Sequence, residues 1–461
     1  MPASNRNPLR VAVLADSDTR WKWGALTADR IVTGNRTDGH RLSGFLLRGR
    51  ATPTPRQLEE VGVRADSLRE VTAVEFLSEM ERDTPDVIVL ALVGGAVQAM
   101  LHGLARVTAD ARLTGASAKR PVVVTGYVGV VYEKLADGLL LRHGADIVLA
   151  NSRQDAERFR AVYEGVGADA SSVTEAALPF LGGAPYVKKN QPRAENDPYT
   201  VVFAAQPSVP ETAAHRTYLL RRLAEHARLH PDREVLLKLR SKPGEHTTHI
   251  EELPYQKLTQ RLDGGLPDNL RLVYGHMGEV LDRTDLLVTV SSTAALESLH
   301  RRIPTAILTD LGVREALGNH HFTGSGCLAS FDQLDAGHLP EPDERWLSRQ
   351  GVAAGGASSG GRTYEQAFDT ARQRVGDLLA EAADGRLAPI APYYSLTTAR
   401  GYLPGILARH HLGPDGTPLP GAPSAERDPG PVRQIVRRAA RGAYRHGVQR
   451  VAPVIRRMGE L

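Results

Sequence analysis

Three hydroxyl-bearing residues follow a buried apolar run in the second half of the chain. The run Leu286 to Val290 leads into Ser291, Ser292 and Thr293, and a helix-like stretch with Glu297 comes next. Serine and threonine at such a turn can cap a helix and leave backbone N–H groups facing outward, where anions such as phosphate bind. A capped helix that simply follows a strand would show the same pattern. The turn is therefore either a structural cap or a phosphate site.

Cationic side chains gather at the end of an earlier strand-like run. Strand alternation from Lys238 would place Arg240 on the same face, with Lys242 beyond the strand end. Three cations at a strand end can hold a diphosphate, because both arginine and lysine donate charge-assisted hydrogen bonds to phosphate oxygens. A solvated sheet edge is the alternative. His276 ends the next run and adds a further polar side chain.

A polar segment, residues 16–24, follows the first apolar run and is interpreted as a loop at a strand end. It contains two carboxylates, Asp16 and Asp18, and two cations, Arg20 and Lys22. Ligands of open α/β sheets bind at the carboxyl ends of strands. The carboxylates have the spacing of a metal-binding pair, and could equally supply a general base. The alternative is a helix N-cap and a turn with its tryptophans packed inward.

Apolar runs of strand length alternate with amphipathic stretches along the chain. In the first half the runs are 9–15, 42–47, 86–92, 121–125, 147–150 and 172–176. In the second half they are 200–204, 235–239, 271–273, 285–290 and 305–308. Alternation of this kind predicts parallel, doubly wound sheets. The expected fold class is α/β, with two Rossmann-like domains whose loops surround one cleft.

The length of 461 residues also favours more than one domain. The expected organisation comprises two Rossmann-like domains, helices that pack back on the body, a flexible linker and a basic amphipathic helix. These parts are expected at residues 1–185, 199–350, 362–411, 412–430 and 431–461, in that order.

The positive charge of the chain is concentrated at its end. The net charge is +4, but residues 431–461 hold eight Arg and one Glu, so the remainder is net negative. A nucleic-acid partner is therefore not expected. An amphipathic helix with this charge suits an anionic membrane surface, and the alternative is packing on its own domain.

Several site types are missing from the sequence. No Gly-rich loop ends in Gly-Lys-Ser/Thr, and no Gly-x-Gly-x-x-Gly follows the first strand, so the usual ATPase and dinucleotide signatures are absent. The single cysteine, Cys327, excludes an internal disulfide framework. Together with the lack of a signal peptide or membrane-spanning run, this predicts a cytoplasmic protein, either free or peripheral on the inner face of the membrane.

The two Rossmann-like halves resemble a GT-B glycosyltransferase. Within that fold, the Ser-Ser-Thr helix start, Glu297 and the Lys-x-Arg-x-Lys-Pro stretch resemble the capsule-polysaccharide and polysialic-acid type of transferase. Those enzymes hold the donor phosphates with a basic or His-Pro motif and a Ser/Thr motif. The motif resemblance covers mainly residues 199–330, and the first half is similar only in architecture. The Ser-Ser-Thr stretch is also similar to lipid-linked glycerophosphate transferases and to non-hydrolysing sugar-nucleotide epimerases.

The resemblance implies a role for each candidate residue. The implied donor-binding set is Lys238, Arg240, Lys242, His276, Ser291, Ser292, Thr293 and Glu297. The implied acceptor side is Arg20, Lys22, Gly126 and Tyr127, with Asp16 or Asp18 as the catalytic base. Because Ser-Lys-Pro stands where His-Pro is expected, His276 is the candidate substitute for the missing histidine. Neither a metal nor a cofactor is implied, because the nucleotide-sugar is a substrate and protein cations stabilise its phosphates.

The predicted activity is transfer of a sugar from a nucleotide-sugar to a glycan or lipid-linked acceptor in cell-envelope polysaccharide synthesis. The basic tail would hold the enzyme near membrane-linked acceptors. Two alternatives remain: a sugar-nucleotide epimerase of the same fold, and a non-catalytic, membrane-associated binding protein.

Overall fold

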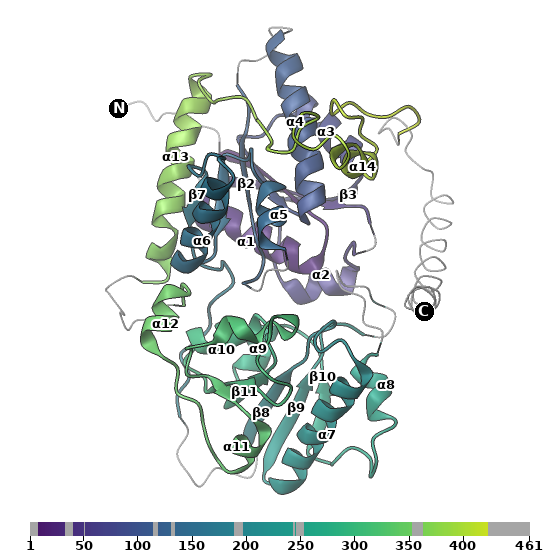
Figure 1. Cartoon of the computed structure of the whole chain (residues 1–461), viewed down its shortest axis with the longest axis vertical. Helices are drawn as coiled ribbons and strands as arrows, with labels where there is room; N and C mark the ends of the chain where they lie inside the picture. Colours follow the sequence, from purple (N-terminus) through teal and green to yellow (C-terminus); the bar gives the residue numbers. More distant parts are fainter. Residues whose placement is uncertain are drawn as a thin grey trace. The chain divides into compact units, whose positions relative to one another are not determined.

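The computed structural model describes residues 8–32, 40–49, 51–113, 119–130, 134–188, 197–242, 245, 253–352 and 363–422. The chain divides into two compact units, which are treated separately below (Figure 1). The first unit combines the chain up to Pro185 with Leu299–Arg302 and Pro342–Pro423, and the second contains Tyr186–Ser298 and Ile303–Glu341. The expected basic helix at 431–461 and the end of the expected linker, from residue 423, lie outside the described residues.

The first unit contains a sheet of seven parallel strands in the order β3-β2-β1-β4-β5-β6-β7. The strands are β1 (Leu9–Ala15), β2 (His40–Leu47), β3 (Ser67–Val71), β4 (Val87–Ala91), β5 (Val122–Gly126), β6 (Ile147–Ala150) and β7 (Val173–Glu175). Every residue of β4, β5 and β6 is buried, as expected for strands covered on both faces. The chain order reverses between β1 and β4, which makes that boundary the topological switch point.

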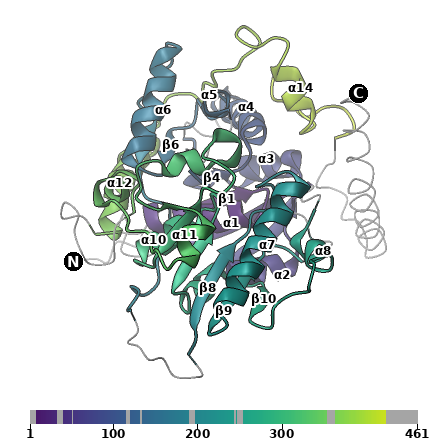
Figure 2. The ribbon, with the colours of Figure 1, turned by 60° about the horizontal axis from the view of Figure 1, so that its bottom comes forward.

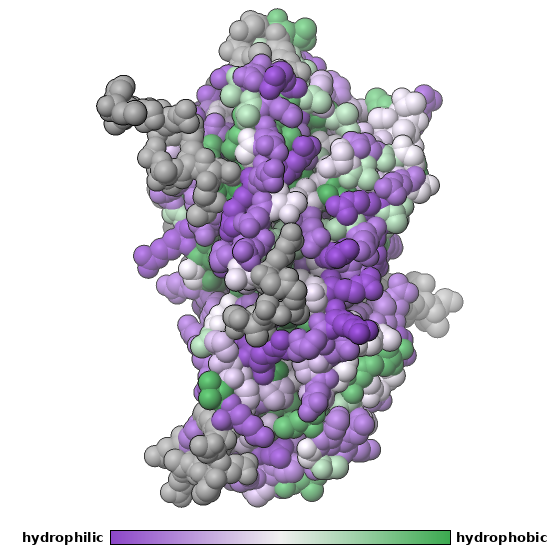
Figure 3. Space-filling model, turned by 90° about the vertical axis from the view of Figure 1, so that its left-hand side faces the viewer, coloured by the Kyte–Doolittle hydropathy of each residue, from purple (hydrophilic) through white to green (hydrophobic). Residues whose placement is uncertain are grey.

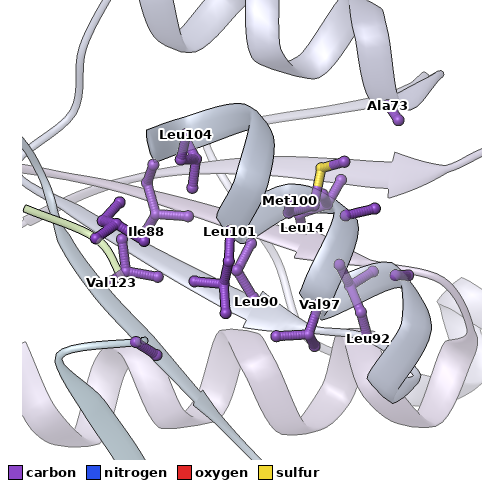
Figure 4. Close-up of a cluster of buried hydrophobic side chains, with 14 of the residues drawn as sticks. Leu14, Ala73, Ile88, Leu90, Leu92, Val97, Met100, Leu101, Leu104 and Val123 are labelled. Carbon is purple, nitrogen blue, oxygen red and sulfur yellow. The ribbon is translucent and has the colours of Figure 1, made fainter. Parts of the chain in front are cut away.

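Helices cover both faces of this sheet. They are α1 (Asp18–Val32), α2 (Pro55–Val61), α3 (Ala73–Arg82), α4 (Gly94–Leu113), α5 (Leu135–Leu140), α6 (Arg153–Gly165), α12 (Glu344–Arg349), α13 (Asp369–Ala383) and α14 (Leu403–Ala408). Val97, Leu101 and Leu104 recur at helical spacing on α4 and point toward the strands (Figure 4). Burial of each such side chain contributes about 1.5–3 kcal/mol.

Helix α1 lies against the sheet with almost no space between them. Trp21 and Trp23 are 0% and 1% exposed. A Cβ on Gly24 would lie only 2.7 Å from Val13 Cγ1 and 2.8 Å from Ala91 Cβ, so glycine permits the close approach. The helix begins at Asp18, so the interpretation of residues 18–24 as a loop is wrong. The alternative of a helix start with inward tryptophans is the observed one.

The second unit contains six parallel strands in the order β10-β9-β8-β11-β12-β13. These are β8 (Tyr199–Ala204), β9 (Arg233–Lys238), β10 (Leu270–Val273), β11 (Leu286–Thr289), β12 (Thr305–Leu308) and β13 (Leu328–Ala329). Its helices are α7 (Ala213–Leu229), α8 (Tyr255–Thr259), α9 (Met277–Leu281), α10 (Ala294–His300) and α11 (Phe331–Asp335). Helix α7 covers β8 and β9 (Figure 2), and the switch point lies between β8 and β11.

The predicted fold class, α/β with two doubly wound Rossmann-like domains, is confirmed by these sheets. The segment 362–411, where helices were expected, contains a 3-10 turn at Glu365–Phe368 together with α13 and α14. Figure 3 shows a face dominated by hydrophilic residues, with hydrophobic residues scattered among them. Within the described residues, no helix is both long and apolar enough to cross a membrane.

Candidate functional site

The carboxyl edge of the second sheet collects the predicted donor-binding residues. Strand pairing places one row of residues side by side across five strands: Val273, Lys238, Ala204, Thr289 and Ile307. Neighbouring strands are about 4.8 Å apart, so the backbone positions of Lys238 and Thr289 are separated by about 10 Å. The segments that carry His276, Arg240 and the Ser-Ser-Thr turn all follow this row. The fold therefore brings these sequence candidates to one edge.

Ser291 serves the structure of the turn. Its backbone N–H donates to Gln206 Oε1 at 3.0 Å, and its hydroxyl donates to the Leu317 carbonyl at 2.6 Å. The side chain of Gln206 also donates to Ser291 Oγ at 3.2 Å. Since Ser291 is only 5% exposed, its polar groups are engaged inside the protein.

The next two hydroxyl residues are more accessible. Ser292 and Thr293 are partly exposed. The Ser292 hydroxyl accepts a hydrogen bond from the Ala294 N–H at 3.3 Å, which is a capping contact. The Thr293 hydroxyl has no hydrogen bond within the part of the chain that the structure describes. Glu297, in the first turn of α10, is 8% exposed.

Gln206 was not among the predicted site residues, yet it connects the two strand ends at the switch point of the second sheet. Gln206 follows β8, and its amide contacts Ser291 after β11. The loop that carries Gln206 is held by the buried Arg216, whose Nη1 donates to the Gln206 carbonyl at 3.2 Å and to the Pro207 carbonyl at 3.1 Å. The Arg216 guanidinium lies 4.4 Å from the centre of the Tyr255 ring. This pair fixes the loop beside the Ser-Ser-Thr turn.

The three predicted cations differ in exposure. Lys238 is 8% exposed, and its Nζ donates to the Leu239 carbonyl at 2.9 Å. Arg240 is partly exposed and Lys242 is exposed. Because β9 ends at Lys238, the expected strand alternation does not extend to Arg240. His276 is partly exposed and precedes α9 without capping it through its side chain.

Asp16 lies at the switch point of the first sheet, directly after β1. One carboxylate oxygen forms an ion pair with Arg20 Nη1 at 2.8 Å, and the other accepts the Val93 N–H at 3.0 Å. Val93 precedes α4, so Asp16 links the ends of β1 and β4. The side chains of Asp16 and Arg20 are 14% and 18% exposed.

The other predicted residues of the first unit have varied surroundings. Asp18 is the first residue of α1 and accepts from the Thr19 hydroxyl at 3.4 Å. Lys22 Nζ lies 5.1 Å from the centre of the Phe180 ring. Gly126 is buried, and a Cβ there would lie 2.9 Å from the Trp23 ring, so Gly126 has a packing role.

The buried Arg142 is a functional candidate that sequence reasoning missed. It donates to the carbonyls of Leu92 at 3.2 Å and Gly126 at 3.0 Å, and thereby joins the ends of β4 and β5. Its guanidinium lies 4.0 Å from the centre of the Tyr127 ring. Burial lowers the pKa of Arg142 and raises the pKa of Tyr127. Arg142 has no ion pair within the described residues.

His410 is a second missed candidate. It follows α14, and burial lowers its pKa, while the nearby Asp16 carboxylate acts in the opposite direction. No spacing rule could have connected two residues so far apart in the chain.

One group of described residues has metal-ligand spacing: His226, His230 and Asp335. Arg222 Nη2 lies 2.9 Å from the Asp335 carboxylate, and Arg233 Nη1 lies 3.3 Å from His226 Nε2. These arginines oppose the binding of a cation. The predicted carboxylate pair of Asp16 and Asp18 forms no such group with other described residues.

Comparison with known proteins gives one family match. The family model described as "Putative glycosyltransferase (DUF6716)" matches residues 11–365. No curated protein matches the chain.

Solved structures match with low identity. UDP-GlcNAc 2-epimerase from Neisseria meningitidis bound to UDP-GlcNAc is 9% identical, with a TM-score of 0.48, and the match covers 81% of this chain and 100% of that chain. The glycosyltransferase SnogD from Streptomyces nogalater is 16% identical, with a TM-score of 0.36 and coverage of 82% and 99%.

Proposed function

This chain belongs to the family described as "Putative glycosyltransferase (DUF6716)", and we propose that it transfers a sugar from a nucleotide-sugar to a glycan or lipid-linked hydroxyl. The observation that carries the proposal is the carboxyl edge of the second sheet. Partly exposed hydroxyl, imidazole and guanidinium side chains follow β11, β10 and β9 there, respectively, near the switch point. Open α/β sheets bind their ligands at this place.

The donor diphosphate would bind between the hydroxyl turn and the cations. Thr293 offers a free hydroxyl, while Arg240 and Lys242 offer positive charge from the end of β9. Arginine can bind two phosphate oxygens at once. Glu297 would accept hydrogen bonds from ribose or sugar hydroxyls. In this arrangement Ser291 and Gln206 position the turn and do not contact the donor.

The acceptor would bind at the carboxyl edge of the first sheet, near Asp16 and Arg20. A base removes the acceptor proton, and the acceptor oxygen then bonds to the anomeric carbon of the sugar. The bond from that carbon to the diphosphate oxygen breaks, and its electron pair leaves with the nucleoside diphosphate. Protein cations stabilise this leaving group, so we propose a reaction independent of bound metal.

The resemblance of the Ser-Ser-Thr and Lys-x-Arg-x-Lys stretches to capsule-type transferases supports an acceptor in cell-envelope polysaccharide synthesis. Membrane association through residues 431–461 belongs to the same proposal. Sedimentation with anionic liposomes, with and without these residues, tests it: equal sedimentation of both proteins would contradict a membrane role for the tail.

A thermal-shift screen with UDP, CMP, CDP, GDP and TDP tests the donor site. A nucleotide that binds only the folded state raises the melting temperature by mass action. Thr293→Val and Arg240→Ala should reduce the shift. Arg271→Ala is a matched control, since Arg271 is an exposed arginine on β10. Equal shifts in all four proteins would contradict the site.

The reaction itself is tested with UDP-sugars in the absence of an acceptor. Accumulation of an epimerised sugar nucleotide would refute the transferase and favour the epimerase. Failure of every nucleotide to bind would favour the non-catalytic alternative.

A further inference from the structure

We propose that His410 is the general base that accepts the proton of the acceptor hydroxyl, and that Asp16 is its positioning residue. This inference rests on the proposed transferase function and assigns the base that the function requires. It replaces the expectation that Asp16 or Asp18 acts as the base directly.

Helix α14 determines where His410 lies. Leu403 and Leu407 are fully buried in the core that α4 also lines. On the adjoining face, Ile406 Cγ2 lies 3.7 Å from the position of a Cβ on Gly95, in the first turn of α4. Helix α14 therefore packs beside the start of α4.

The turn that follows α14 carries His410 toward Asp16. Arg409 has helical backbone angles, and the His410 N–H donates to the Leu407 carbonyl at 2.9 Å, so the helical path of the chain continues for about two more residues. His410 then lies on the same face as Ile406, four residues earlier. That face meets the segment whose Val93 N–H holds Asp16.

The imidazole of His410 is free to receive a proton. The residue is partly exposed, and neither ring nitrogen has a hydrogen bond to any residue that the structure describes. In contrast, both oxygens of Asp16 already have partners, Arg20 and the Val93 N–H. Both oxygens of Asp16 are therefore engaged, and its negative charge can still attract a cation nearby.

The charges around His410 favour a neutral ring that becomes charged during the reaction. Burial lowers the pKa of His410, Asp16 opposes this, and His411 and Arg409 lower it further. Arg20 and Arg142 also lie near Asp16, and their positive charges disfavour a positive charge in its surroundings. Burial thus favours the neutral ring, which is the form that can act as a base, and Asp16 supplies the negative charge that stabilises the imidazolium.

The proton and electron balance is complete. The acceptor O–H bond breaks, its proton joins a ring nitrogen of His410, and the oxygen electron pair forms the new bond to the anomeric carbon. The bond between that carbon and the diphosphate breaks, and the nucleoside diphosphate leaves with the electron pair. The imidazolium afterwards releases its proton to water.

The first test compares two adjacent histidines in the full chain. His410→Gln should lower kcat/KM about 10²–10⁴-fold, the usual contribution of a general base, without changing the thermal shift produced by the nucleotide. His411→Asn is the matched control, because His411 is exposed and has φ 59°, which asparagine tolerates. Its kcat/KM at pH values above the His410 pKa should remain unchanged. The rise of wild-type kcat/KM with pH through the His410 pKa should disappear in His410→Gln.

The second test measures the pKa of His410 by NMR, with His410→Gln used to assign its ring signal. Asp16→Asn should lower this pKa, because the negative charge is lost. An unchanged pKa would overturn the pairing even if no sugar transfer were detected. If wild-type transfer occurs and His410→Gln retains it, the base assignment is wrong, whereas the proposed function stands. If wild-type protein binds nucleotide but transfers no sugar, the proposed function fails, and the base assignment with it.

Discussion

Replacement of Gly24 by alanine should destabilise the first unit, whereas the same replacement at Gly165 should not. Both glycines are in helices, Gly24 in α1 and Gly165 at the end of α6. The added methyl group at Gly24 would lie 2.7 Å from Val13 Cγ1 and 2.8 Å from Ala91 Cβ, while no atom lies within 4 Å of the corresponding position at Gly165. The two substitutions add the same methyl group, but only the site at Gly165 has room for it.

The expected magnitude follows from two opposing effects. Overpacking in a filled core costs about 1–3 kcal/mol. Replacement of glycine by alanine inside a helix stabilises the folded protein by about 0.5–1 kcal/mol. Neither Val13 nor Ala91 can move without a shift of its strand, so Gly24→Ala should lose about 1–2 kcal/mol of net stability. Gly165→Ala should be neutral or gain a few tenths of a kcal/mol.

Denaturant unfolding monitored by tryptophan fluorescence measures the difference, because Trp21 and Trp23 lie in the perturbed helix. Sugar transfer should also fall in Gly24→Ala, since Arg20 lies one turn before Gly24 and holds Asp16. If Gly24→Ala were as stable as Gly165→Ala, the close packing of α1 on the sheet would be refuted.

Three other outcomes follow from contacts in the second unit. Gln206→Leu should lower the free energy of unfolding by about 1–3 kcal/mol, because it leaves the buried Ser291 N–H without an acceptor. It should also weaken nucleotide binding. A thermal-shift titration with the nucleotide that stabilises the protein measures stability and affinity, and unaltered affinity would argue against a positioning role for Gln206. Ser291→Ala should lower the melting temperature more than Thr293→Val does. Thr293→Val should weaken nucleotide binding more than Ser291→Ala does. The reverse ranking in either measurement would contradict a structural role for Ser291 and a binding role for Thr293. Burial raises the pKa of the Cys327 thiol to about 11, so its thiolate fraction at pH 8 is small. Alkylation of Cys327 should therefore be slow until the protein unfolds, and rapid labelling of the native protein would contradict this burial.

The strands that are buried on both faces were predictable, because continuous apolar runs leave few other interpretations. β4 and β6 are entirely apolar, and both correspond to predicted runs. β3 was not predicted because it is an edge strand: Ser67, Leu68 and Arg69 are exposed, so it lacks a long apolar run. β13 has only two residues, too few for any periodicity.

The candidate site was predictable where a residue lies within a few positions of a strand end. Asp16 and Ser291 were identified for this reason, and each lies at a switch point. Their partners come from distant segments: Gln206 is 85 residues from Ser291, and Val93 is 77 residues from Asp16. His410 depends on the packing of α14, which leaves no local pattern in the sequence.

Residues 18–24 show how composition can mislead. Carboxylates and cations after the first strand suggested a functional loop, but the segment is helical and its two tryptophans are core residues. Gly24 provided the missing signal, because a glycine inside a helix that covers a sheet often marks a close approach.

The chain order of the first unit affects how the protein can be made. Its sheet is complete by Glu175, but α13 and α14, which belong to the same unit, are synthesised only after the described part of the second unit. Domains normally fold during synthesis as they emerge, yet here the face of α4 that α14 covers must wait for Leu403 and Leu407. A protein shortened before residue 342 would expose that face and would lack His410. An isolated first unit should therefore require residues 8–185 joined to 342–422, and a nascent chain should acquire activity only at the end of its synthesis.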